Sequence, residues 1–208
     1  MTNSISRQIL LSVLGIALLL VALVGVSYAI FTTTIQGTKE NSISTGTISM
    51  SYVESTNGIT LSNAMPISDE IGKQLVGENN VFDFVVSSSI RGITTVHYEV
   101  VAEKIPVPGE VVSDQNIRLY LQKKEGDTYV DTELTREAKP FVQNGFTSML
   151  GSPAEGMILY SGSFQSTEVS GGEYYDYFRL RMWLAEDSVI DNISRSFKIK
   201  INVYGKVL

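Results

Sequence analysis

The sequence of 208 residues contains no cysteine and only one histidine, His97, and these shortages remove much of the usual chemistry of enzymes. Without cysteine there is no disulfide, no thiol nucleophile and no cysteine-ligated zinc site. The zinc-peptidase motif His-Glu-x-x-His, the Gly-x-Ser-x-Gly turn of serine hydrolases and the GxxxxGK phosphate loop are also absent. A catalytic triad would have to use His97, which the alternation of its neighbours places on the solvent side of a strand. We therefore expect no enzymatic activity.

Charged residues make up 18% of the chain and are slightly acidic on balance, with 16 basic and 22 acidic side chains and a net charge of -6. Nucleic-acid-binding surfaces are normally basic because they face phosphates, so no nucleic-acid partner is expected. Two acidic stretches, Asp69-Glu70 and Glu186-Asp187 with Asp191, carry the oxygen ligands that calcium prefers. Neither has EF-hand spacing, and acidic turns are common on surfaces. The prediction is no cofactor, with a structural calcium ion as the alternative.

One long apolar run stands at the N-terminus. Residues 9–31 contain no charged side chain and follow a polar start that carries Arg7. As a helix rising ~1.5 Å per residue, this run is long enough to cross a hydrocarbon core roughly 30 Å thick. Residues 1–29 are either a signal peptide, with Ser27 and Ala29 at the cleavage site, or an uncleaved membrane anchor. Both interpretations place the remainder outside the cytoplasm, in the extracellular space or at the cell surface.

The rest of the chain alternates apolar and polar residues with the period of two that indicates half-buried β-strands. Strands are expected at residues 47–53, 81–86, 95–102, 116–122, 177–184 and 195–205. Six or more such strands, separated by turn signals, predict an all-β fold. The expected architecture is an antiparallel, jelly-roll-like β-sandwich formed by residues 47–208.

Helix signals in this part of the chain are few. Ser68 is a plausible N-cap, with Asp69 and Glu70 in the first turn, where the helix dipole favours negative charge. A second short helix is expected before Pro140, which would end it. Residues 103–114 and 143–156 are expected to be loops at one end of the sandwich.

The order of elements at the N-terminus resembles the TasA/camelysin family of exported proteins. The elements of this resemblance are the apolar run, Ala29, Phe31, a threonine run at 32–34, Asn41, and Gly46-Thr47-Ile48 at the start of a strand. Leu61 and Pro66 resemble a later segment of the family, and residues 197–205 resemble its last strand. Residues 103–170 show little resemblance. Camelysin is classed as a metalloprotease, but that activity is not carried over because its histidine motif is missing here.

The resemblance implies an exported structural protein that polymerises head to tail into fibres of a biofilm matrix or cell surface. In such fibres the freed N-terminal segment of one subunit pairs with the sheet of the next, because an open sheet edge has unpaired N–H and C=O groups. Residues 30–46 would then be a donor strand or linker, with Ile30, Phe31 and Ile35 in the donor strand. Two alternatives stay open: the segment is the first strand of its own domain, or the protein is a membrane-tethered adhesion or envelope domain that does not polymerise, including a virus-encoded one.

An aromatic stretch at residues 174–183 supplies a further candidate surface. Tyr175, Tyr177 and Trp183 fall on the strand face opposite Phe178 and Leu180. They are candidates for stacking against a sugar or a protein partner. The alternative is that both faces of a central strand are covered.

Overall fold

The computed structural model describes residues 13–19, 32–36, 40–44, 48–54, 58–77, 81–189 and 195–207, with the backbone alone for 32–36 and 40–44. Residues 13–19 are helical, and the rest of the N-terminal apolar run lies outside the described residues. Among the helices of the described ranges, none combines the length and apolar character needed to span a membrane.

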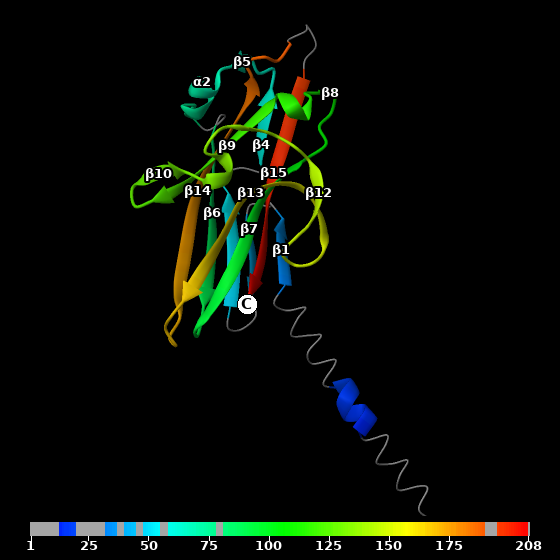
Figure 1. Ribbon diagram of the computed structural model, residues 1–208, viewed down its shortest axis with the longest axis vertical. Helices are drawn as coiled ribbons and strands as arrows, with labels where there is room; N and C mark the ends of the chain where they lie inside the picture. Colours follow the sequence, from blue (N-terminus) through cyan, green and yellow to red (C-terminus); the bar gives the residue numbers. More distant parts are fainter. Residues whose placement is uncertain are drawn as a thin grey trace, which may run out of the picture.

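Two antiparallel sheets pack face to face and form a β-sandwich (Figure 1). The first, sheet A, has the order β1-β15-β7-β13-β12, and β4 and β8 also pair with β15. Its strands are β1 (Thr32–Gln36), β4 (Ile59–Ser62), β7 (Thr94–Lys104), β8 (Glu110–Val111), β12 (Asn144–Thr147), β13 (Pro153–Ser166) and β15 (Arg195–Val207). The two-residue pairing of β8 with β15 is parallel.

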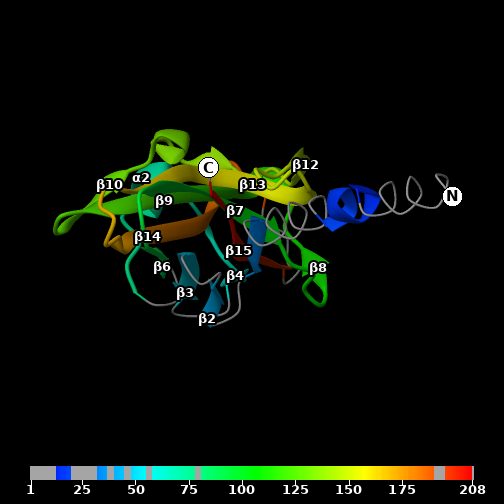
Figure 2. The same cartoon turned by 90° about the horizontal axis from the view of Figure 1, so that it is seen from below.

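The second, sheet B, has the order β10-β9-β14-β6-β3-β2, with β11 on β9 and β5 on β14. Its strands are β2 (Glu40–Ser44), β3 (Ile48–Glu54), β5 (Pro66–Ile67), β6 (Val81–Ile90), β9 (Ile117–Glu125), β10 (Thr128–Asp131), β11 (Lys139–Pro140) and β14 (Gly172–Ala185). Seen from below, the two sheets appear as two layers (Figure 2). The prediction of an antiparallel all-β sandwich is confirmed.

The core consists of the side chains that the alternation assigned to the inner faces. On β6, Phe82, Phe84 and Val86 are buried, and the rings of Phe84 and Phe178 stack at 5.2 Å between centroids on neighbouring strands. Buried inner residues of the other long strands include Met50, Tyr52, Val96, Tyr98, Val100, Ile117, Leu119, Leu121, Leu180, Met182, Phe197, Ile199, Ile201 and Val203. Alternation predicts these faces correctly because successive side chains of a strand point to opposite sides.

The helices are short, as expected. α2 (Asp69–Lys73) begins after Ser68 at its N-cap position, and the 3-10 turns are η1 (Asp114–Asn116) and η2 (Glu133–Thr135). The prediction that 143–156 is a loop is wrong, because this stretch contains β12 and the start of β13. The full length of β13 was missed because a bulge between Ile158 and Tyr160 breaks its period, and Gly156 and Gly162 interrupt its apolar pattern.

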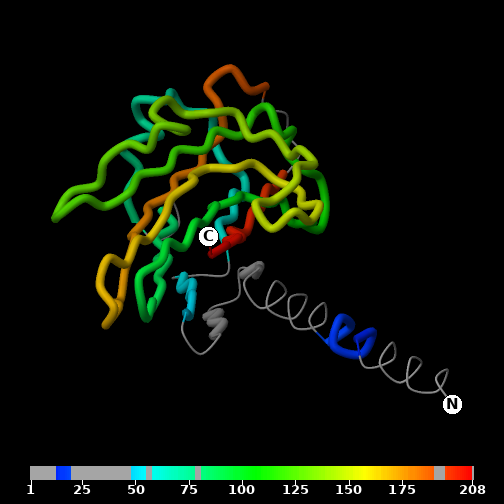
Figure 3. The backbone as a smooth tube through the Cα atoms, turned by 60° about the horizontal axis from the view of Figure 1, so that its bottom comes forward, coloured from blue at the N-terminus to red at the C-terminus, as the bar shows by residue number. Residues whose placement is uncertain are grey.

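The β12–β13 hairpin covers part of the outer face of sheet A. The ring of Phe146 meets Tyr204 of β15 edge-on, at 6.1 Å between centroids. The backbone N–H of Met149 donates a hydrogen bond to Glu99 on β7 at 3.2 Å. At the other end of β13, the turn that leads into β14 projects from the sandwich (Figure 3).

Candidate functional site

The outer face of sheet B presents two exposed tyrosines on β14. Tyr175 and Tyr177 alternate with the inward Asp176 and Phe178, so both rings point away from the core. Their exposed fractions are 50% and 45%, and their ring centroids are 6.4 Å apart with an interplanar angle of 24°. The prediction that these two residues share an exposed face agrees with this placement.

Side chains from neighbouring strands extend this surface. The Lys124 ammonium on β9 lies 5.9 Å from the centre of the Tyr177 ring. The Arg179 guanidinium lies 4.3 Å from the centre of the Tyr129 ring on β10, and it donates two hydrogen bonds of 2.8 Å to Asp83 on β6. Arg179 of β14 is thereby held by contacts with both β6 and β10. We call Lys124, Tyr129, Tyr175, Tyr177 and Arg179 the tyrosine face.

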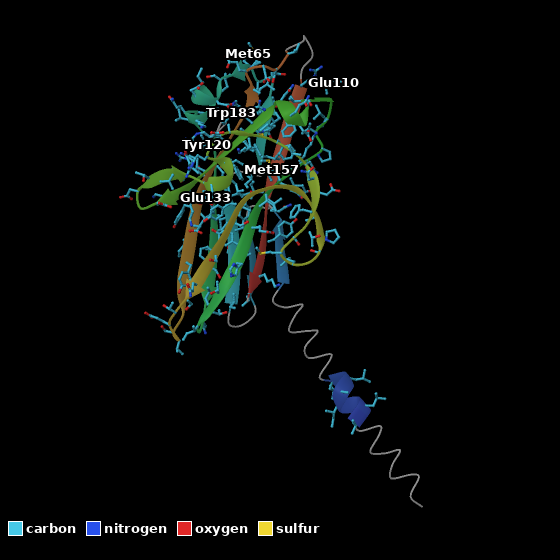
Figure 4. The ribbon with its side chains drawn as sticks, in the orientation of Figure 1. Met65, Glu110, Tyr120, Glu133, Met157 and Trp183 are labelled. Carbon is cyan, nitrogen blue, oxygen red and sulfur yellow. The ribbon has the colours of Figure 1, made fainter. Side chains whose placement is uncertain are left out.

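Trp183 does not belong to this surface, which corrects the sequence-based grouping. Its side chain is 1% exposed, and its indole N–H donates a 3.2 Å hydrogen bond to Asp69 of α2. Gly72 of the same helix lies directly against the ring. Figure 4 labels Trp183 beneath the part of the chain that contains α2. Both faces of β14 are therefore covered at this end, because α2 lies across the outer one.

The two acidic stretches, distant in sequence, meet at this end of the sandwich. Asp69, Glu70, Glu186 and Asp187 line a surface depression of about 510 Å³ together with Arg118. The Arg118 guanidinium lies 3.7 Å from Asp187. Within the described ranges, no three histidine, aspartate or glutamate side chains are arranged to hold a metal ion. Asp191 lies outside those ranges.

His97 occupies a half-buried position on the outer face of β7, as the alternation predicts. Ser163 of β13 is directly opposite it on one side and Lys206 of β15 on the other. A serine beside a histidine is the beginning of a nucleophilic site, but no hydrogen bond joins these two side chains within the described structure. His97 and Ser163 are therefore cross-strand neighbours on the outer face of sheet A.

A polar network joins the two sheets at the end of the sandwich near Asp176. The Lys123 ammonium on β9 lies 2.8 Å from Asp176 and donates a 3.2 Å hydrogen bond to the Tyr160 hydroxyl on β13. The Tyr98 hydroxyl on β7 donates to the other oxygen of Asp176. Burial lowers the pKa of Lys123, but the hydrogen bond and charge of Asp176 outweigh it and leave the pKa raised. Burial, and then Asp176, raise the pKa of Tyr98 above its ordinary value. The network thus ties sheet A to sheet B through charged hydrogen bonds.

The N-terminal segment lies in its own sheet in this chain. β1 pairs antiparallel with residues 202–206 of β15, and Ile35 is opposite Val203. It occupies the same edge of β15 as β4, which pairs with residues 196–199, because β7 occupies the other edge. The other predicted residues of the segment, Ile30 and Phe31, and the cleavage-site residues Ser27 and Ala29 lie outside the described residues.

Comparisons with known proteins give no family. No family model matches the chain, and no curated protein matches it. A carbohydrate-binding module, TmCBM61 in complex with β-1,4-galactotriose, is a solved structure with 8% sequence identity over 75% of this chain and 86% of that one. The TM-score is 0.22, and at that value the similarity supports no inference about this chain.

Proposed function

We propose that this protein is an exported structural subunit of the TasA type, which assembles head to tail into extracellular or cell-surface fibres by strand addition. The observation that carries the proposal is the position of β1. This strand follows the N-terminal apolar run closely in sequence and lies at the outer edge of sheet A, where it pairs with five residues of β15.

A terminal segment at a sheet edge is suited to exchange between copies. The edge of β15 at residues 202–206 accepts residues 32–36 in a defined antiparallel register. The same segment of a neighbouring copy would present the same hydrogen-bonding groups to that edge. A subunit that donates β1 in one direction and receives it from the other makes a contact that does not close, and such contacts propagate as a filament. Export and release of the segment would therefore couple to assembly.

The test is deletion of residues 30–37, with electron microscopy of the exported protein. We expect the intact exported protein to form filaments and the deletion variant to form none, while its circular-dichroism spectrum remains that of a β-protein. Filaments in the deletion variant would contradict the donor role. A second variant, Ile35→Asp, leaves the length unchanged but places a charge in the uncharged segment, and we expect it to reduce polymerisation as well.

The competing function is a membrane-tethered adhesion or envelope domain that does not polymerise. The two functions differ in whether residues 1–29 are cleaved off or retained as a membrane anchor. N-terminal sequencing of the exported protein is expected to begin at Ile30 if it is a fibre subunit. An intact chain starting at Met1 in the membrane fraction, without filaments, would favour the tethered domain.

A further inference from the structure

We infer that the protein has a second assembly surface, the free edge of β13, and that this edge pairs antiparallel with the same strand of a second copy. We call residues 161–166 the β13 edge. On one side these residues pair with β7 in regular register. On the other side β12 pairs with residues 153–156, and no strand in the described part of the chain pairs with 161–166. Figure 2 shows β13 at the rim of sheet A, beyond β7 and β15.

The η2 turn packs against β13, and the contacts of its neighbours place it near the start of that strand. Hydrogen bonds fix Thr135 of η2 to Leu121 of β9, and Leu121 is opposite Leu180 of β14. Two ring pairs join β14 to β13: Phe178 with Tyr160 at 5.0 Å, and Tyr174 with Phe164 at 6.1 Å. Because Tyr174 lies beside Phe164 and Phe178 beside Tyr160, higher residue numbers on β14 correspond to lower ones on β13. Leu180 is therefore level with the part of β13 that precedes Tyr160. The η2 turn lies at that start, away from residues 161–166.

The β13 edge lacks the devices that normally keep sheet edges apart. Residues 156–167 include no charged side chain and no proline. Sheet edges in monomeric proteins are commonly blunted by lysine, proline, bulges or very short strands. The bulge of β13 lies between Ile158 and Tyr160, ahead of the regular part. By contrast, the rim strand β10 of sheet B is four residues long and ends in Asp131.

The sequence of the β13 edge allows it to pair antiparallel with the same edge of a second copy. Ser161, Ser163 and Gln165 are exposed on the outer face, while Phe164 points inward and Gly162 occupies an inner-face position beside Tyr98. A two-fold axis at Ser163 puts Ser163 opposite its equivalent and Ser161 opposite Gln165, so each residue meets one that faces the same side of the sheet.

The flanking charges also permit this register. The nearest acidic residues are Glu155 and Glu168. With the axis at Ser163, Ser166 falls opposite Tyr160 of the other copy, and Glu168 lies beyond the end of β13, so no two carboxylates face each other. An uncharged edge gains no ion pair from a charged partner strand, whereas a second uncharged edge satisfies its main-chain groups without burying charge. Two-fold pairing of this kind is the commonest way in which identical chains associate. Sheet A would continue across the pair.

This surface is independent of the one used for strand addition. β1 and β13 lie on opposite sides of the β15–β7 pair in sheet A. One edge can therefore exchange β1 along a filament while the other joins two copies sideways. Loss of either interface leaves the other intact, so the two proposals fail separately.

Cysteine cross-linking tests the pairing, because the full chain contains no cysteine of its own. The variants are Ser161→Cys, Ser163→Cys and Gln165→Cys, with Ser170→Cys as the control in the exposed β13–β14 turn. Directly opposite residues in an antiparallel pair have Cβ atoms about 4.5–5.5 Å apart, close enough for a disulfide. We expect Ser163→Cys to form a disulfide-linked dimer roughly tenfold or more faster than Ser170→Cys, since pairing raises the local thiol concentration. Ser161→Cys is expected to cross-link efficiently only when mixed with Gln165→Cys.

A second measurement does not depend on disulfide chemistry. Ser163→Lys places two ammonium groups at the two-fold axis, and we expect it to convert the dimer of the full chain, purified in detergent, to the monomer in light scattering. Ser170→Lys is expected to remain dimeric. The inference is overturned if the unsubstituted chain is monomeric at high concentration, or if Ser163→Cys cross-links no faster than Ser170→Cys. Deletion of residues 30–37 should leave this dimer unchanged.

Discussion

The indole of Trp183 lies flat against Gly72 of α2, so close that a Cβ added at position 72 would overlap the ring. The same ring donates a hydrogen bond to Asp69 at the start of the helix. A five-residue helix has little stability of its own, so this contact helps to fix where α2 lies, together with the hydrogen bond from Arg181 to the Leu75 carbonyl. The helix in turn buries the outer face of β14 at this end, where the sequence left open whether both faces are covered.

Replacing Gly72 with alanine is expected to lower the free energy of unfolding by roughly 1–3 kcal/mol, the usual cost of overpacking a dense core. Alanine has the higher helix propensity, by about 1 kcal/mol, but the overlap with the ring outweighs that gain. Chemical denaturation followed by fluorescence measures the change. Gly145→Ala is the control, because a Cβ there meets no atom within 4 Å. Equal stability of the two variants would contradict the tight contact.

Trp183 is the single tryptophan of the chain, so its fluorescence reports one site. Because its side chain is 1% exposed, we expect blue-shifted emission and slow quenching by acrylamide in the folded protein. Gly72→Ala should shift the emission to the red if the helix is displaced. Emission typical of a water-exposed indole in the unsubstituted protein would show that Trp183 does face a partner or solvent.

Asp176 is expected to contribute to stability through the network between the sheets, because its carboxylate contacts both Lys123 and Tyr98. Asp176→Asn leaves Lys123 charged and three-quarters buried, with a side chain 24% exposed. The loss expected in the free energy of unfolding is about 1–3 kcal/mol, below the cost of orphaning a fully buried charge because water still reaches part of the lysine.

The control for this prediction is Asp187→Asn. That carboxylate is 85% exposed and lies 3.7 Å from Arg118. Exposed ion pairs contribute little to stability, so we expect no measurable change in urea midpoint. A similar loss in both variants would mean that the loss at Asp176 does not come from the buried network.

The buried carboxyl group of Glu54 should make the free energy of unfolding depend on pH. Its carboxyl group is buried, accepts a 2.5 Å hydrogen bond from Tyr52, and has one oxygen without a hydrogen-bond partner among the described residues. Burial raises the pKa of Glu54 from 4.5, against the Tyr52 hydrogen bond and the Lys198 charge, which lower it. The folded protein therefore holds this proton to higher pH than the unfolded chain does. Its contribution to stability is complete below pH 4.5 and is lost as the pH rises through the folded pKa.

The measurement is the free energy of unfolding from pH 4 to 8 for the original protein and Glu54→Gln. Glutamine stays neutral, so the difference between the two curves should change with pH, by at most about 1.4 kcal/mol per pH unit for one proton. We expect Glu54→Gln to gain relative stability as the pH rises above 4.5. Parallel curves would mean that Glu54 titrates normally in the folded state.

Much of the fold was readable from local pattern. Phe82, Phe84 and Val86 point inward because alternate side chains of a strand must face opposite ways, and that rule needs no knowledge of the neighbours. The short helix after Ser68 was equally local. β13 was missed because its bulge and its glycines remove the signal, although the strand itself is 14 residues long.

The candidate surfaces were only partly readable. The sequence assigned Tyr175 and Tyr177 correctly to an outer face, but gave no reason to add Tyr129, which comes alongside through the register of β10, β9 and β14. The sequence also gave no indication that Asp69-Glu70 and Glu186-Asp187 lie close together, although both line one surface depression.

The sequence by itself determined which side chains face inward and that the described chain forms sheets, because both follow from the two-residue geometry of an extended backbone. The tertiary structure alone decided which strands are neighbours, that no described strand pairs with the outer edge of residues 161–166, and that α2 covers Trp183. These outcomes depend on contacts between residues far apart along the chain, and the free energy of packing that selects among them is not encoded in any local pattern.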